Sequence, residues 1–233
     1  FGSKFGAEPK GCIALIERAV SLGFTPSMTF HPGTQCEDAG AWTKYIDVCA
    51  DIARRAGVRL SRLNVGGGFP AHRSQAAPDL ERMFRSIVGA VASAFGADAP
   101  ALVCEPGRAM VAEAFQLCAR VKSRRPDGRV YLNDGIYGGM AEAALIGSVE
   151  RIAVFGADGA HRTGPSFDAV VFGPTCDSLD RIKGTVSLPE TTTEDDYILF
   201  DGMGAYSTAT LTRFNGYGAF EIVTLDRAST HAT

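Results

Sequence analysis

The first half of the chain alternates between helix-like and strand-like patterns. Apolar side chains recur at helical spacing in three segments, and glycines stand where these segments end. A short strand-like run follows each segment, and the third of these runs is apolar, which is typical of a buried strand. Such alternation predicts a parallel sheet with helical crossovers. The expected helices cover residues 11–23, 42–57 and 78–95, with Pro78 as a first helical residue, and the expected strands cover residues 27–30, 62–65 and 102–104.

From residue 114 onward, short β-type runs replace this alternation. Gly, Pro and Asp turns separate them, with one helical interruption expected at 139–147 and a solvated loop at 191–196. We therefore predict two domains, residues 1–113 and residues 114–233, the second an antiparallel β-sandwich or barrel. Its expected strands cover residues 115–121, 130–132, 151–155, 169–172, 197–200 and 220–225.

Three β/α units are too few to close an eight-stranded barrel, which takes about 250 residues by itself. The first domain is therefore either a small open sheet or part of a barrel that continues upstream.

Composition excludes several classes of partner. The chain has 233 residues, 45% of them hydrophobic, and a formal net charge of −3, so no general attraction to nucleic acid or an anionic membrane is expected. No apolar run approaches the ~20 residues of a membrane span. None of the six cysteines forms a C-x-x-C pair, and their spacing fits neither a metal site nor a disulfide framework. We expect a cytoplasmic protein whose thiols are mostly reduced and buried.

Residues that can carry chemistry follow each of the three expected strands. In a parallel sheet these ends converge on one face, where α/β folds bind ligands. Consecutive glycines present bare N–H groups to phosphate oxygens, and an arginine offers a forked cation with the same preference. An acid beside them suits a ligand with a basic ring and a phosphate. The residues are His31, Gly33 and Thr34, then Gly66, Gly67 and Gly68, then Glu105, Gly107 and Arg108.

Each of these features also has a simpler interpretation. Glu105 and Arg108 could form a strand-end salt bridge, the three glycines could be a flexible turn, and His31 could be a structural hydrogen-bonding residue. The coincidence of three such strand ends favours a ligand site.

One turn in the second half carries a candidate acid. Cys176 lies in the turn 173–180 beside Asp177, whereas the other cysteines lie in apolar contexts. A loop thiol beside an acid can exchange protons with a ligand, although an incidental thiol has the same local pattern. Tyr206 follows a tight glycine turn and could offer its hydroxyl to a phosphate or be an ordinary half-buried tyrosine.

Taken together, these motifs resemble the pyridoxal-phosphate-dependent decarboxylases of the ornithine/diaminopimelate decarboxylase family. Those enzymes have an alanine-racemase-like barrel and a β-domain. The turn with Asp177 resembles the ornithine branch, because the diaminopimelate branch usually has a glutamate after the cysteine. The matching strings follow the family's order: FHPGTQ (30–35), NVGGGFP (64–70), CEPGR (104–108), LNDGIYG (132–138), GPTCDSLD (173–180), MGAYS (203–207) and RFNGYG (213–218).

The resemblance implies a partial (β/α)8 barrel, then a β-domain, and pyridoxal 5′-phosphate as cofactor. His31 would stack on its ring, Glu105 would pair with the ring nitrogen to make the ring an electron sink, and Cys176 would return a proton after carbon dioxide leaves. Those three are the expected catalytic residues. The expected cofactor-binding residues are His31, Thr34, Gly66, Gly67, Gly68, Glu105, Gly107, Arg108 and Tyr206.

The resemblance also implies a substrate pocket and a partner. Asp177 would face the distal amine of the substrate, and Cys176 and Asp177 would reach into the neighbouring subunit's site, which implies a homodimer with shared active sites. Glu142 stands where ornithine-type relatives carry an aspartate for the distal ammonium, and Phe214 completes the expected substrate-binding set.

The departures from the family concern the lysine that carries the cofactor. It lies on an early barrel strand in the family, and none of the lysines here stands in its context. We therefore expect this chain to be the C-terminal part of such an enzyme, about 60% of it by the size of the barrel, and inactive alone. Pro32 and Thr34 replace residues that are often Val and Ser in the family.

The expected function is decarboxylation of ornithine or lysine to a polyamine-type diamine, as a carboxy-lyase. Arginine or diaminopimelate decarboxylation remains an alternative, as does a non-catalytic homologue that regulates true decarboxylases as a partner subunit. The string CDSLD argues against a racemase of the same barrel class.

Overall fold

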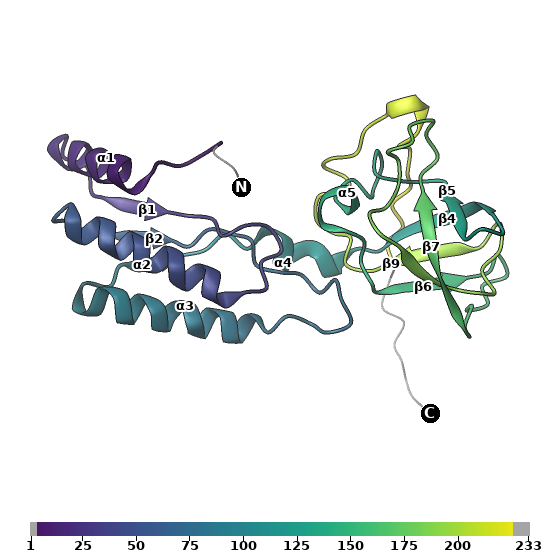
Figure 1. Cartoon of the computed structure of the whole chain (residues 1–233), viewed down its shortest axis with the longest axis horizontal. Coiled ribbons are helices and arrows are strands. Elements are labelled where there is room, and N and C mark those ends of the chain that lie inside the picture. The colour runs from purple at the N-terminus through teal and green to yellow at the C-terminus, as the bar shows by residue number, and fades with distance from the viewer. Residues whose placement is uncertain (1–3, 226–233) are drawn as a thin grey trace. The chain divides into compact units, whose positions relative to one another are not determined.

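The computed structural model describes residues 4–225, which form two compact units (Figure 1). The pattern change after residue 113 lies near the first division between the units. The sequence pattern did not predict that two later segments also belong to the first unit. The first unit contains residues up to Cys118 with Val149–Ala153 and Leu199–Ala205, and the second contains Ala119–Ser148, Val154–Ile198 and the residues from Tyr206 on.

The first unit is built on a three-stranded parallel sheet in the order β1-β2-β3. Met28 pairs with Leu63, and Leu63 pairs with Leu102. The predicted alternation of helix and strand is thus confirmed. The elements are α1 (Pro9–Ser21), β1 (Ser27–Thr29), α2 (Ala39–Arg55), β2 (Arg62–Asn64), α3 (Leu80–Phe95), η1 (Gly96–Asp98), β3 (Ala101–Val103), α4 (Gly107–Val111) and η2 (Ala112–Ala114).

Aspartate caps set where the two long helices begin. The Asp38 carboxylate accepts from the Gly40 N–H at 2.8 Å and starts α2, and the Asp79 carboxylate accepts from the Arg82 N–H at 2.8 Å and starts α3. Pro78 is therefore not the first helical residue, as the sequence suggested, because the cap follows it.

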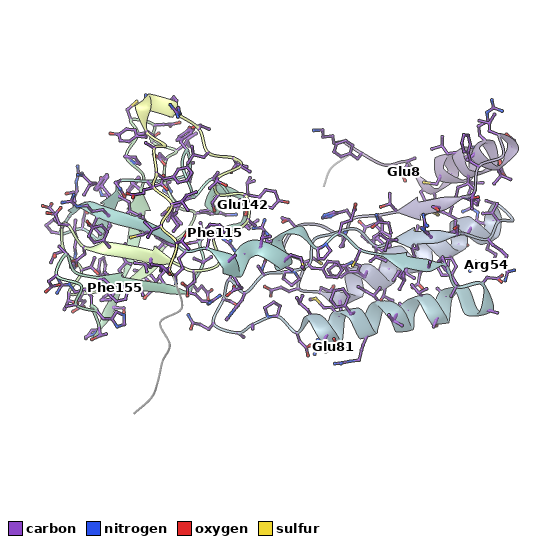
Figure 2. The ribbon with its side chains drawn as sticks, turned by 180° about the vertical axis from the view of Figure 1, so that it is seen from behind. Glu8, Arg54, Glu81, Phe115, Glu142 and Phe155 are labelled. Atoms are coloured by element: carbon purple, nitrogen blue, oxygen red, sulfur yellow. The ribbon has the colours of Figure 1, made fainter. Side chains whose placement is uncertain are left out.

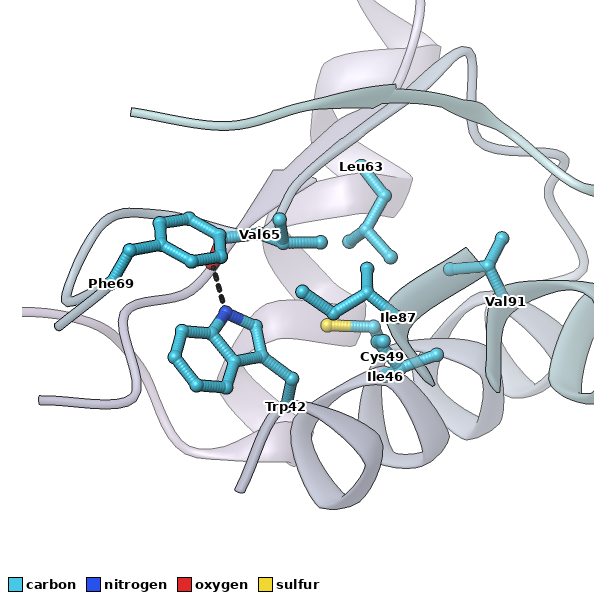
Figure 3. Packing of buried hydrophobic residues seen from close by; sticks show 8 residues of the cluster. All are labelled: Trp42, Ile46, Cys49, Leu63, Val65, Phe69, Ile87 and Val91. Atoms are coloured by element: carbon cyan, nitrogen blue, oxygen red, sulfur yellow. Dashed lines mark hydrogen bonds between the residues drawn. The ribbon is translucent and has the colours of Figure 1, made fainter. Parts of the chain in front are cut away.

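The core of the first unit lies between β2 and the helices α2 and α3 (Figure 3). The Trp42 indole N–H donates to the Val65 carbonyl at 3.1 Å, and its ring stacks on Phe69 with centroids 5.0 Å apart. The core therefore fixes the chain on both sides of the three glycines. Its members are Trp42, Ile46, Cys49, Leu63, Val65, Phe69, Ile87 and Val91.

The third strand is less buried than its sequence predicts. Leu102 and Val103 are 37% and 38% exposed, because β3 has β2 as its one paired neighbour among the described residues. All six cysteines are free thiols, as expected, but Cys104 and Cys118 are exposed together with Cys176. Burial raises the pKa of the Cys49 thiol to about 11, which keeps it protonated and inert.

The second sheet has six strands in the order β6-β9-β4-β5-β7-β8. It is mixed and not antiparallel as predicted, because β5 and β7 pair in parallel after a crossover that contains α5 and β6. The β4–β5 and β7–β8 pairs are antiparallel. The elements are β4 (Leu117–Arg124), β5 (Arg129–Leu132), α5 (Ala143–Ile146), β6 (Ile152–Phe155), β7 (Ser166–Phe172), β8 (Val186–Pro189), β9 (Tyr197–Phe200) and η3 (Phe214–Gly216).

Three local expectations for this half are wrong. Residues 220–225 form no strand, the helix expected over 139–147 shortens to α5, and the loop 191–196 is not solvated throughout. Thr192 and Asp196 are buried, and Asp196 pairs with Arg162 at 3.0 Å. Within residues 4–225, no helix is long and apolar enough to cross a membrane.

Candidate functional site

In the first unit, the glycine loop Gly66–Gly68 packs directly against the segments that follow β1 and β3. A Cβ atom on Gly66 would clash with the Phe30 carbonyl oxygen, and one on Gly67 would lie 2.6 Å from that of Glu105. Gly68 meets the Gly33 carbonyl even more closely, at a φ of 82° that favours glycine. The glycines are therefore required by close backbone approach, and a merely flexible turn does not account for them.

Hydrogen bonds hold the glycine loop in place on both sides. The Glu105 N–H donates to the Gly66 carbonyl and the Cys36 N–H to the Gly68 carbonyl, each at 2.8 Å. The Asn64 side chain accepts from the Gly66 N–H at 2.9 Å. The three strand ends predicted to converge do so, and the loop between them is rigidly supported.

The imidazole of His31 lies over the glycine loop. Its Nε2 is 3.3 Å from the Cβ position of Gly67, and its Nδ1 accepts from the Gly33 N–H at 3.1 Å. Because Nδ1 is the acceptor, the proton of the neutral ring is on Nε2.

Arg108 brings a buried cation to the same place. It lies in α4, is 7% exposed, and donates from Nη2 to the Thr34 hydroxyl at 3.3 Å. Gly107 precedes it, and a Cβ on Gly107 would meet no atom within 4 Å. A fixed guanidinium, a hydroxyl and a glycine loop form a donor set suited to a phosphate group, so these residues fit the phosphate end of pyridoxal phosphate.

In the second unit, Cys176 and Asp177 lie in the turn that follows β7. The Tyr137 hydroxyl donates to the Asp177 carboxylate, which also accepts from the Leu179 N–H at 2.9 Å. The hydrogen bond from Tyr137 lowers the pKa of Asp177, and the same bond raises the pKa of Tyr137. Asp177 is therefore held as a carboxylate, the form that pairs with an ammonium group.

The thiol of Cys176 is oriented by a segment far along the chain. The Asn215 side-chain oxygen accepts from the Cys176 N–H at 3.2 Å and from its thiol at 3.3 Å. Phe214 packs its ring on Tyr137 with centroids 4.6 Å apart. The structure thus brings together Cys176, Asp177 and Phe214, and adds Tyr137 and Asn215.

Sequence reasoning did not select Tyr137 or Asn215 as site residues. Both stand in the strings that carry the resemblance, LNDGIYG and RFNGYG, which was the signal available.

A buried carboxylate, that of Asp180, fastens this turn to the segment that carries Tyr137. Asp180 is 1% exposed and accepts from the Ile136 N–H, the Thr175 N–H and the Thr175 hydroxyl at 2.7–3.0 Å. Within the segment that carries Tyr137, the partly buried Asp134 accepts from the Gly139 N–H at 3.0 Å, and burial raises its pKa. The glycines in both segments leave room for these side chains.

A pocket of about 720 Å³ opens beside this turn. The Lys122 cation lines it together with carboxylates, hydroxyls and apolar groups, so a polar ligand group can be accommodated. Its walls include Lys122, Tyr131, Asn133, Cys176, Asp177 and Tyr217.

The two remaining predicted residues lie on other segments of the second unit. Glu142, labelled in Figure 2, precedes α5, accepts from the Leu145 and Ile146 N–H groups through its carbonyl, and is absent from the residues that line the pocket. Tyr206 belongs to the second unit, is 50% exposed and has a φ of 61°. Their roles stay predictions.

Comparison with known sequences gives one family. Residues 20–204 match the family described as pyridoxal-dependent decarboxylase, C-terminal sheet domain. Antizyme inhibitor 2 of Xenopus laevis is 30% identical over 92% of this chain and 50% of its own length, and ornithine decarboxylase of Mus musculus has the same identity and coverage. The chain thus spans about half the length of these curated relatives.

Solved structures agree with this match. Arginine decarboxylase of Paramecium bursaria Chlorella virus is 28% identical with a TM-score of 0.76, covering 94% of this chain and 60% of the other. Lysine/ornithine decarboxylase of Vibrio vulnificus, complexed with cadaverine, is 30% identical with a TM-score of 0.74, covering 93% and 60%.

Proposed function

The chain belongs to the pyridoxal-dependent decarboxylases, and from this premise we propose that the protein that carries it removes the carboxylate of a basic amino acid. The proposal rests on the contacts and hydrogen bonds that hold the two groups of candidate site residues in place. The glycine loop, Thr34 and Arg108 form a phosphate cradle, and the turn of Cys176 and Asp177 is held by Tyr137 and Asn215.

The cofactor-binding residues follow from the donors in the first unit. Backbone groups of Gly66–Gly68 and Gly107, the Thr34 hydroxyl and the Arg108 guanidinium would hold the phosphate, joined by the Tyr206 hydroxyl. His31 would cover the pyridine ring, and Glu105 would pair with its nitrogen. Pyridoxal phosphate, when bound, supplies an electron sink for the electrons that the departing carboxylate leaves behind.

The second cluster would handle the substrate and a proton. Cys176 holds a proton on Sγ, with Asn215 orienting it, and would deliver it to the carbon that has lost its carboxylate. Asp177, kept ionised by Tyr137, would pair with the distal cation of the substrate. Phe214 would shape the apolar wall around its alkyl chain.

We propose that the three β/α units are part of a (β/α)8 barrel, with residues 1–113 as its portion and residues 114–233 as the sheet domain. Their parallel order and the convergence of their strand ends support this. We also propose a cytoplasmic homodimer in which Cys176 and Asp177 serve the site of the neighbouring subunit.

For the substrate we propose ornithine or lysine, with arginine and diaminopimelate as alternatives. A Vibrio vulnificus relative named lysine/ornithine decarboxylase supports this choice, while the viral relative named arginine decarboxylase supports the alternative. Glu142 would be a second anchor for the distal cation.

The test is carbon dioxide release by the full-length protein from ornithine, lysine, arginine and meso-diaminopimelate. We expect ornithine or lysine to give the highest kcat/KM, and Glu142→Gln to lower it by roughly 2–5 kcal/mol of transition-state free energy. Preference for diaminopimelate, or an unchanged Glu142→Gln enzyme, contradicts the pocket assignment.

A second candidate function is regulation, which the similarity to antizyme inhibitor 2 favours. A protein of this kind would release no carbon dioxide from any of the four amino acids and would still associate with a catalytic decarboxylase of the family. Co-purification with such a decarboxylase, combined with the same assay, separates the two candidates.

A further inference from the structure

Gln35 holds a backbone conformation that favours glycine. Its φ is 49°, in the left-handed region, and it directly follows Thr34 of the phosphate cradle. A residue with a side chain persists in such a conformation where its surroundings fix it, and such positions concentrate at ligand sites.

The side chain of Gln35 makes a two-point contact with one backbone residue. Its Nε2 donates to the Ala71 carbonyl at 2.7 Å, and its Oε1 accepts from the Ala71 N–H at 3.0 Å. Ala71 is 6% exposed, so water competes little for these bonds. Two bonds in one amide plane fix both the distance and the orientation between the segments that they join.

These segments are the two loops of the phosphate cradle. The N–H of Cys36, the next residue, donates to the Gly68 carbonyl. Two consecutive residues after Thr34 are therefore hydrogen-bonded to the segment from Gly68 to Ala71. On the other side, Thr34 accepts from Arg108. Gln35 therefore lies between the hydroxyl that contacts Arg108 and the glycine loop.

We propose that Gln35 is a positioning residue that sets the separation of the Thr34 hydroxyl and the Gly67 and Gly68 N–H groups, and so the affinity of the cradle for a phosphate monoester. This inference rests on the proposed function, because it assigns a phosphate to that cradle. Gln35 itself touches the protein backbone and need not touch the ligand.

Three substitutions separate the effect of the two Gln35–Ala71 hydrogen bonds, which together act as a clamp, from the effect of the unfavourable φ at residue 35. Gln35→Ala removes both hydrogen bonds and keeps the unfavourable φ, whereas Gln35→Gly removes both bonds and relieves the φ. Gln35→Glu keeps the size and, as a carboxylate, faces the Ala71 carbonyl with a second acceptor. When protonated, the same Glu offers one donor and one acceptor, as the amide does.

Trp42 provides the readout, because it is the single tryptophan of these 233 residues and contacts Val65 and Phe69 on either side of the glycine loop. Its fluorescence is followed in the full-length protein, with any tryptophan elsewhere replaced by phenylalanine, during titration with pyridoxal 5′-phosphate and, separately, with inorganic phosphate. We expect Gln35→Gly and Gln35→Glu to weaken both ligands about tenfold or more at neutral pH, from the loss of two hydrogen bonds.

Gln75→Glu is the matched control, since Gln75 makes one long contact, 3.5 Å, with the Glu150 carbonyl. It should leave both affinities within about twofold of wild type. The thermal unfolding midpoint of Gln35→Gly should be higher than that of Gln35→Ala. Amide hydrogen exchange at Ala71 and Cys36 should be faster in both variants than in wild type.

The decisive measurement is the affinity of Gln35→Glu relative to wild type as pH falls. Recovery toward the wild-type affinity as the carboxyl protonates supports the clamp, because a general loss of structure would not be reversed. Wild-type affinity in Gln35→Gly overturns the role of Gln35. Wild-type protein that binds neither ligand overturns the phosphate assignment, and with it both the proposed function and this inference.

Discussion

At the scale of single residues, the Tyr137–Asp177 hydrogen bond sets the charge of the candidate substrate anchor. Removal of the hydroxyl in Tyr137→Phe should raise the pKa of Asp177 toward its ordinary value, with the Leu179 N–H still lowering it in part. NMR titration of the Asp177 carboxyl carbon measures this directly.

The same bond makes a signed contribution to stability. Because the pKa of Asp177 is lowered on folding, the bond stabilises the protein above the ordinary carboxyl pKa, and the contribution is lost as pH falls through the lowered value. Tyr137→Phe should therefore differ from wild type at neutral pH and converge with it in acid. Tyr217→Phe, in the wall of the same pocket, should leave the Asp177 titration unchanged. An unmoved Asp177 midpoint in Tyr137→Phe refutes the assignment.

At the scale of elements, the glycine loop is the part of the fold with least tolerance. Gly68→Ala adds a Cβ against the Gly33 carbonyl at a φ of 82°, so we expect a loss of roughly 2–5 kcal/mol in unfolding free energy. Gly89→Ala in α3 is the control with the opposite sign, because its Cβ meets nothing within 4 Å. It should gain roughly 0.5–1 kcal/mol, as Ala replaces Gly within a helix. Chemical denaturation of both variants decides, and equal stabilities would be inconsistent with a tightly packed loop.

Sequence patterns predicted the elements that are determined by residues close together along the chain. The helical face that carries Trp42, Ile46 and Cys49 requires a core on one side, and that core is present. The strand-end glycines were found because their position directly after a strand-like run is visible in the sequence.

Other features depend on partners far along the chain. Asp196 lies in a polar run, and its burial follows from pairing with Arg162, 34 residues away. The parallel pairing of β5 and β7 follows from the crossover, which no strand pattern encodes. Residues 220–225 are rich in aromatic and β-branched residues, as strands are, but this composition alone supplies no neighbouring strand. The roles of Tyr137 and Asn215 required the turn of Cys176 to be placed in space.

At the scale of the whole molecule, the proposed homodimer draws its cofactor-binding and proton-donating residues from different units. Arg108 lies in the first unit and Cys176 in the second. If each active site combines the first unit of one subunit with the second unit of its neighbour, a subunit with Arg108→Ala and one with Cys176→Ala can together form one intact site.

Mixing these two inactive full-length variants should therefore restore part of the activity, in proportion to the mixed dimers formed. Differently tagged subunits measure that proportion by co-purification. Arg108→Ala mixed with Glu105→Ala is the control, because both changes fall in the first unit and no arrangement of two subunits gives an intact site. Recovery in the first mixture and none in the second requires shared sites. Mixed dimers without recovery would mean that each site is built from one chain, and that Cys176 acts within its own subunit.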